Sequence, residues 1–198
     1  RFAIWRAQSD LAATLAAANE KHLIFHGRGG SLARGGGRID ALVQTAPASA
    51  INGVLRLTEQ GEAINQSYGL SPIALRTLDR AFSALSLATS QAIRSPPQAD
   101  NPKHIELCAR MVEVSRDTYR RLVFSDPTFF EYFETVTPID VISRMQIGSR
   151  PLVRGSGSGV DTIRAVPWMF AWSQSRHMLP GWFGAGTGLA AVIDRYGE

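Results

Sequence analysis

Three short apolar segments, separated by long stretches with helical periodicity, constrain the fold of this chain most. The strand candidates are residues 22–25, 54–58 and 163–172. Strands joined by helical connections pair in parallel, and parallel sheets are buried on both faces. We therefore predict a helix-rich α/β fold with about three short buried strands and six to eight helices. Three strands cannot close a barrel, so we expect the chain to be part of something larger.

Apolar residues at helical spacing predict three longer helices, over residues 1–20, 70–89 and 105–124. Two shorter helices are expected to begin after the polar and proline-containing stretches at 125–127 and 137–138. The single cysteine, Cys108, falls on the apolar stripe of the third long helix, so we predict that it lies in the core.

Composition excludes several classes of protein. With 44% hydrophobic and 19% charged residues, the 198-residue chain can bury a core and is not disordered by composition. No apolar run approaches the roughly 18–20 residues of a membrane span, so we expect no membrane partner. One cysteine cannot form an internal disulfide, which favours a reducing compartment.

The basic residues are almost all arginine. Of 21 basic residues only Lys21 and Lys103 are lysine, and the net charge is +4. A guanidinium is a planar group with several fixed N–H donors, so it binds carboxylate or phosphate through two parallel hydrogen bonds, whereas the lysine ammonium is a mobile point charge. Codon bias also explains such a ratio, so the positions of the arginines carry more information than their number.

A glycine-rich stretch, residues 26–37, follows the first strand candidate directly. Six of its twelve residues are glycine, and it carries His26, Arg28 and Arg34. Glycines let backbone N–H groups approach an anion, and a loop of this kind can close two arginines over it. The alternative is a surface turn with solvated arginines, and this stretch alone leaves both interpretations open.

The standard nucleotide-binding patterns do not fit this loop. Gly30 to Gly35 has the frame of a Walker loop, but Gly36 stands where lysine is required, and Leu32 stands where a dinucleotide fingerprint needs its third glycine. Arginine–glycine boxes that bind RNA are repetitive and disordered, whereas this loop is short and flanked by periodic segments. We therefore expect no nucleic-acid partner.

The motif Phe25-His-Gly-Arg-Gly-Gly-Ser-Leu-Ala-Arg-Gly-Gly-Gly37 resembles the glycine loop of the phosphoenolpyruvate carboxylase family. Blocks 52–62, 147–151 and 163–174 resemble the same family in the same order, so the likeness covers essentially the whole chain. It implies a large cytoplasmic lyase on a (β/α)8 barrel, a homotetramer under allosteric control. Residues 1–198 would form a single segment of its catalytic barrel domain, within the carboxy-terminal half.

The resemblance also implies an activity and roles for individual residues. The family adds bicarbonate to phosphoenolpyruvate with Mg²⁺ or Mn²⁺, giving oxaloacetate and phosphate. His26 matches the loop histidine linked to carboxylation, and Arg34 matches the second catalytic arginine of the loop. Arg28, Arg150 and Arg164 match arginines around the substrate. The remaining matches are the loop glycines Gly27, Gly29, Gly30, Gly35 and Gly36.

The chain departs from the family pattern in ways that limit this expectation. Ala33 stands where the family loop usually has glycine, and Arg38 stands where it often has proline. The family's metal ligands and its other catalytic residues precede this segment, so we expect no metal site here and no turnover by the segment alone. A phosphometabolite-binding module without catalysis is the alternative interpretation.

Overall fold

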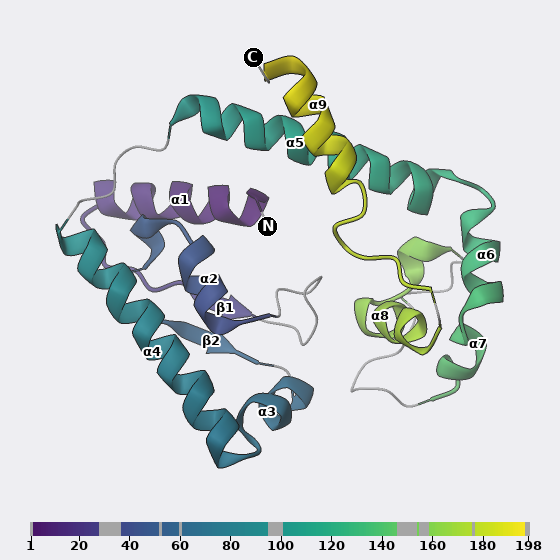
Figure 1. The fold of residues 1–198 in the computed structure, drawn as a ribbon, viewed down its shortest axis with the longest axis horizontal. Helices are drawn as coiled ribbons and strands as arrows, with labels where there is room; N and C mark the ends of the chain where they lie inside the picture. Colours follow the sequence, from purple (N-terminus) through teal and green to yellow (C-terminus); the bar gives the residue numbers. More distant parts are fainter. Residues whose placement is uncertain are drawn as a thin grey trace. The chain divides into compact units, whose positions relative to one another are not determined.

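The computed structural model describes residues 2–27, 37–51, 53–59, 61–94, 101–145, 154, 159–175 and 177–196. The chain forms two compact units, Arg1–Pro102 and Lys103–Glu198 (Figure 1). None of the described helices is long and apolar enough to cross a membrane.

The first unit is a short parallel strand pair combined with helices. Its described elements, in chain order, are α1 (Phe2–Ala17), β1 (Phe25–Gly27), α2 (Ile39–Thr45), the 3-10 turn η2 (Ala48–Ala50), β2 (Arg56–Thr58), α3 (Gly61–Tyr68) and α4 (Ser71–Arg94). The predicted helices over 1–20 and 70–89 are confirmed, and α4 continues five residues beyond its predicted end.

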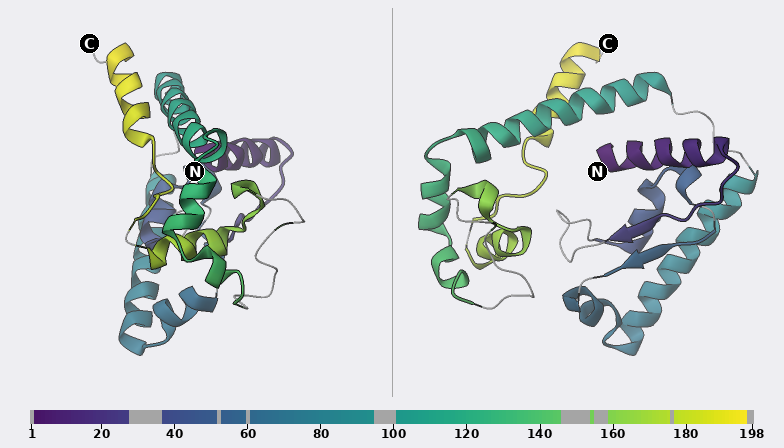
Figure 2. Two further views of the ribbon diagram at one scale, coloured as in Figure 1. Left: turned by 90° about the vertical axis from the view of Figure 1, so that its right-hand side faces the viewer. Right: turned by 180° about the vertical axis from the view of Figure 1, so that it is seen from behind.

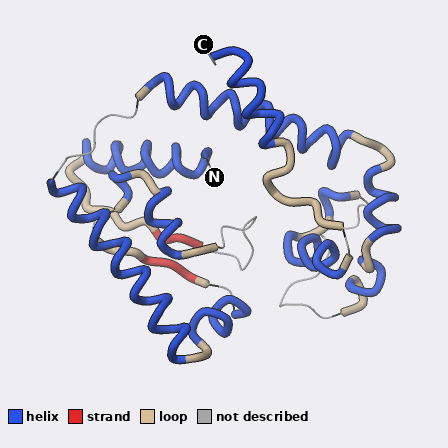
Figure 3. The backbone as a smooth tube through the Cα atoms, viewed as in Figure 1, coloured by secondary structure: helices blue, strands red, loops and turns tan. Residues whose placement is uncertain are grey.

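The two strands pair in parallel, as predicted. The first, predicted over residues 22–25, lies instead at Phe25–Gly27. Figure 3 shows the two strands side by side. Phe25 is opposite Arg56, His26 is opposite Leu57 and Gly27 is opposite Thr58. The chain bends just before β2 at Gly53, whose φ of 74° is a left-handed conformation that favours glycine.

The sheet is covered on one face only, which corrects the prediction of strands buried on both faces. On the covered face His26 is buried, and Ile24 and Leu57 are half-buried. On the other face Phe25 and Val54 are more than half exposed. A parallel sheet is buried on both faces only when other elements lie on both sides of it, and the described part of this unit covers one.

The second unit consists of helices and tight turns. Its described elements are α5 (Pro102–Arg120), the π turn η3 (Arg121–Ser125), α6 (Phe129–Val136), α7 (Ile139–Ile142), the 3-10 turn η4 (Val160–Thr162), α8 (Ala165–Gln174) and α9 (Ala185–Tyr196). The helix predicted over 105–124 and the two short helices that follow it are confirmed.

The core of the second unit is aromatic. Phe133 is fully buried and Trp172 is 3% exposed. The ring of Phe133 stacks on Trp168 with centroids 4.8 Å apart and meets Trp172 at 5.3 Å. Phe129 joins the same cluster, so α6 and α8 are held together by ring contacts.

Two predictions for this unit were wrong. Residues 163–172, expected as a buried strand, contain most of helix α8. A short apolar run has no clear periodicity, so its sequence does not distinguish a buried strand from a buried helix. Pro167 is compatible with the helix because it lies in its first turn, where a proline is tolerated. Cys108, expected in the core, is exposed on α5.

Helices α5 and α9 cross closely, and small residues make the crossing possible (Figure 2). A Cβ on Gly188 would overlap the hydroxyl of Ser115 and the backbone carbonyl of Met111. Near the end of α9, the Tyr196 hydroxyl donates a hydrogen bond of 2.9 Å to Glu106. This bond raises the pKa of Tyr196.

Candidate functional site

His26 lies in the middle of β1, immediately before the glycine-rich loop. Its side chain is 9% exposed on the covered face of the sheet. The backbone of His26 is held in the parallel ladder opposite Leu57, and Gly27 ends the strand. In parallel α/β folds, functional side chains gather beyond the carboxyl ends of the strands, which is where this chain continues into the loop.

Most of the predicted site lies outside the described residues. This holds for Arg28 and Arg34, for Ala33 and for Arg150. It also holds for four of the loop glycines, namely Gly29, Gly30, Gly35 and Gly36. The structure therefore brings together His26 and Gly27 on one strand, and the convergence of the arginines stays a prediction.

The far side of the loop is described from Gly37, and it explains one departure from the family pattern. Arg38 is the N-cap of α2 with φ −65°, which is the value that proline would impose. Its guanidinium pairs with Asp40 in the first turn of that helix. This hydrogen-bonded pair lowers the pKa of Asp40. Arginine at 38 therefore keeps a proline-like backbone angle and adds an ion pair.

Arg164 is the described member of the predicted substrate-binding arginines. It is the N-cap of α8 in an extended conformation, and its backbone carbonyl accepts the N–H of Trp168 at 3.0 Å. Its side chain is half-buried, and its Nε is buried without a hydrogen-bond partner in the described part of the chain. A buried guanidinium N–H without a partner is costly, and an anion would satisfy it.

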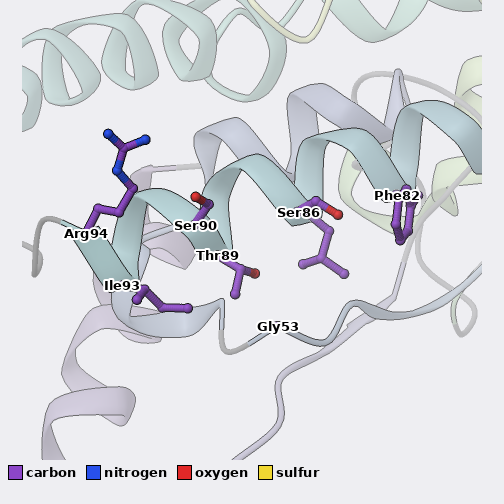
Figure 4. Close-up of a pocket in the computed structure, with 8 residues that line it drawn as sticks. Gly53, Phe82, Ser86, Thr89, Ser90, Ile93 and Arg94 are labelled. Carbon is purple, nitrogen blue, oxygen red and sulfur yellow. The ribbon is translucent and has the colours of Figure 1, made fainter.

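A shallow groove of about 400 Å³ lies beside α4 and is a poor candidate for an anion site. Phe82, Leu85 and Ile93 make it largely apolar. Figure 4 shows Phe82 and Ile93 directed along the side of α4 that faces Gly53, whereas the guanidinium of Arg94 points away from Gly53. The groove therefore offers apolar surface rather than charge.

The described residues do not fit a catalytic metal. No group of three or more histidine, cysteine or acidic side chains in the described ranges could hold a metal ion.

The sequence as a whole decides the family. The profile of the family described as phosphoenolpyruvate carboxylase matches residues 1–198, which is the entire chain. The chain belongs to the phosphoenolpyruvate carboxylase family.

Individual phosphoenolpyruvate carboxylases support this assignment. The chain is 41% identical over 198 residues to "Phosphoenolpyruvate carboxylase" of Xanthomonas oryzae pv. oryzae, covering 98% of this chain and 21% of the relative. It is 41% identical over 194 residues to the Picea abies protein of the same name, covering 98% of this chain and 20% of that protein. The chain thus spans about one fifth of the length of these curated relatives.

One residue of this phosphoenolpyruvate carboxylase segment makes a contact that the sequence does not predict. Arg56 is predicted only as part of a strand, whereas its guanidinium lies over the ring of Phe25, 5.4 Å from the centroid. The available signal was a charged residue inside an apolar strand. Its partner follows only from the strand register, which the sequence does not give.

Proposed function

We propose that the protein containing this segment adds bicarbonate to phosphoenolpyruvate, giving oxaloacetate and phosphate, and that this segment supplies arginines that bind the reacting anions. The observation that carries the proposal is the match of the carboxylase family along all 198 residues. The family's (β/α)8 barrel and homotetramer belong to the same proposal, with β1 and β2 as neighbouring barrel strands.

The chemistry explains the need for fixed cations. A bicarbonate oxygen attacks the phosphorus, and the P–O bond to the enol oxygen breaks, leaving carboxyphosphate and the enolate of pyruvate. Carboxyphosphate separates into CO₂ and phosphate, and the enolate carbon then forms a C–C bond to CO₂. Every species except CO₂ is an anion. Preorganised donors stabilise charge that develops on the phosphoryl and enolate oxygens.

Arginine suits this work better than lysine. It keeps its proton in a site from which water is excluded, and its fork matches two phosphoryl oxygens. In the proposal Arg28, Arg150 and Arg164 bind phosphoenolpyruvate, and the unpartnered Nε of Arg164 is one of the donors available for this. In the proposal His26, which the parallel register holds opposite Leu57, takes part in the carboxylation step.

The loop is proposed to act by closing. Water that reached the enolate would protonate it, and the turnover would end as pyruvate. Closing the loop between Gly27 and Gly37 would bring Arg28 and Arg34 over the anions and exclude water. The implied Mg²⁺ or Mn²⁺ would be held by residues outside the described part of this chain and would supply further charge stabilisation.

The test is a chimera in which residues 1–198 replace the matching fifth of the Xanthomonas oryzae relative. We expect bicarbonate-dependent release of phosphate from phosphoenolpyruvate by the chimera and no turnover by the 198-residue chain alone. In the chimera, Arg28→Ala is expected to lower kcat about 10²- to 10³-fold, as loss of one donor to a developing anion does elsewhere.

Arg144→Ala is the matched control. Arg144 is an arginine of the second unit with a 79% exposed side chain and a long ion pair to Asp140. Its loss is expected to leave kcat unchanged. Robust activity of the Arg28→Ala chimera, with the chimera folded, would contradict the role given to Arg28.

A further inference from the structure

A cation–π contact joins the two strands beside the proposed site. The guanidinium carbon of Arg56 lies 5.4 Å from the centroid of the Phe25 ring. Both side chains are exposed, Phe25 at 58%. Arg56 makes no ion pair with any residue that the structure describes, so the ring is the partner of its charge there. Attraction between a cation and the face of a ring holds the two side chains together.

The register makes this contact the neighbour of His26. Phe25 and Arg56 are directly opposite, and the next pair along the ladder is His26 and Leu57. The strands share only three residue pairs among the described residues. In so short a ladder, one cross-strand side-chain contact contributes much of the interaction that holds the strands in register. Side chains alternate between the faces of a strand, so Arg56 and His26 lie on opposite faces. Arg56 therefore acts on His26 through the backbone of β1.

We propose that Arg56 is a positioning residue: by stacking on Phe25 it aligns the carboxyl end of β1 and so places His26 and the start of the glycine-rich loop. The inference rests on the proposed carboxylase function. Small displacements of catalytic groups lower the rate of the chemical step more than they weaken substrate binding. Losing the contact thus lowers kcat and leaves KM for phosphoenolpyruvate nearly unchanged.

The experiment uses the chimera with the Xanthomonas oryzae relative and measures kcat and KM for bicarbonate-dependent phosphate release. Arg56→Gln and Phe25→Leu are each expected to lower kcat about three- to tenfold, with KM changing less than about twofold. The double variant is expected to be no slower than the slower single variant, because both changes remove one contact. Arg56→Lys and Phe25→Tyr keep a cation and a ring and are expected to recover most of kcat.

The matched control is Arg120→Gln. The guanidinium carbon of Arg120 lies 5.5 Å from the centroid of the Phe124 ring, in the second unit. The substitution therefore removes a cation–π contact of the same kind that does not involve β1. Its kcat is expected to equal that of the unchanged chimera. An equal loss in this control would overturn the proposal.

Three further outcomes would overturn it. They are unchanged kcat in both single variants, losses that multiply in the double variant, and a rise in KM with kcat unchanged, which would mean that Arg56 binds the anion itself. If Arg56→Gln unfolds the chimera, the conservative variants Arg56→Lys and Phe25→Tyr test the proposal instead. Both retain a cation and a ring, so a loss of kcat in both would contradict the stacking role. No bicarbonate-dependent phosphate release by the folded, otherwise unchanged chimera would instead refute the proposed function, whatever the Arg56 variants do.

Discussion

The two units of the chain bury different kinds of residue. Lys103–Glu198 has a continuous aromatic core around Phe133 and Trp172. Arg1–Pro102 buries mainly small and aliphatic side chains and leaves large ones exposed, Phe82 at 72% among them. The second unit thus has a buried aromatic core of its own, although it too leaves Trp182 and Met178 exposed. The first presents a sheet face and a helix face that its described residues do not cover.

This difference indicates what each unit needs in order to be stable. A parallel strand pair with one open face is an incomplete layer, because parallel sheets are buried on both sides. Exposed large apolar side chains along α4 add to the uncovered surface. A chain that spans one fifth of its relatives would have such faces where the rest of the protein packs.

The sharpest test of the comparison is a pair of phenylalanine truncations. Phe133→Ala removes a fully buried ring and is expected to lower the free energy of unfolding of the second unit by about 3–5 kcal/mol. Phe82→Ala removes an exposed ring from α4 and is expected to change stability by less than about 0.5 kcal/mol. Urea unfolding followed by tryptophan fluorescence measures both. Equal effects would show that the two cores do not differ as described.

A second pair of variants tests the helix crossing in the second unit. Gly188→Ala places a methyl group against the backbone carbonyl of Met111, so α9 must move off α5, at a cost of about 1–3 kcal/mol. Gly186→Ala, on the same helix, meets nothing within 4 Å. It is expected to stabilise the unit by about 0.5–1 kcal/mol, because alanine favours helix more than glycine does. Thermal unfolding monitored by circular dichroism distinguishes the two. Destabilisation by both variants would argue against the close crossing.

The smallest expected effect compares two aspartates at helix starts, one in each unit. The pKa of Asp126 is lowered by the hydroxyl and N–H of Thr128, at 2.7 and 2.9 Å, and that of Asp40 is lowered by Arg38. Each group has a depressed folded pKa, so its stabilisation is present above the unfolded value of about 3.9 and is lost as pH falls through the folded pKa.

The pKa values of the two aspartates are expected to respond differently to salt. At 1 M NaCl, where the Debye length is about 3 Å, the pKa of Asp40 is expected to rise towards its ordinary value because its partner is an exposed charge. The pKa of Asp126 should move less, since its partners are neutral donors. Carboxyl NMR titration at low and high salt measures both. A larger salt response at Asp126 would contradict these causes.

Much of the fold could be predicted from the sequence because long amphipathic helices carry their own periodicity. The helices α1, α4 and α5 and the strand β2 follow from spacing and capping residues. The helix α8 could not be told from a strand, because Trp168, Phe170 and their apolar neighbours lack a polar face. The exposure of Cys108 depends on which side of α5 the rest of the unit covers, and local sequence does not contain that information.

The candidate site could be predicted only as a set of residues. The family motifs mark His26 and Arg164, but spacing gives neither the burial of His26 nor the position of Arg164 at the start of a helix. Arg56 was missed because its contact with Phe25 depends on strand register. Contacts that bring distant parts of the chain together are set by tertiary packing, which a single sequence does not specify.

The central claim is that guanidinium groups distant in sequence bind one phosphate ester. The most direct measurement is a crystal structure of the chimera with a phosphonate analogue of phosphoenolpyruvate. We expect guanidinium nitrogens of Arg28, Arg150 and Arg164 to lie about 2.7–2.9 Å from oxygens of the analogue. Side chains of these three residues on unrelated surfaces, with the analogue bound elsewhere, would contradict it.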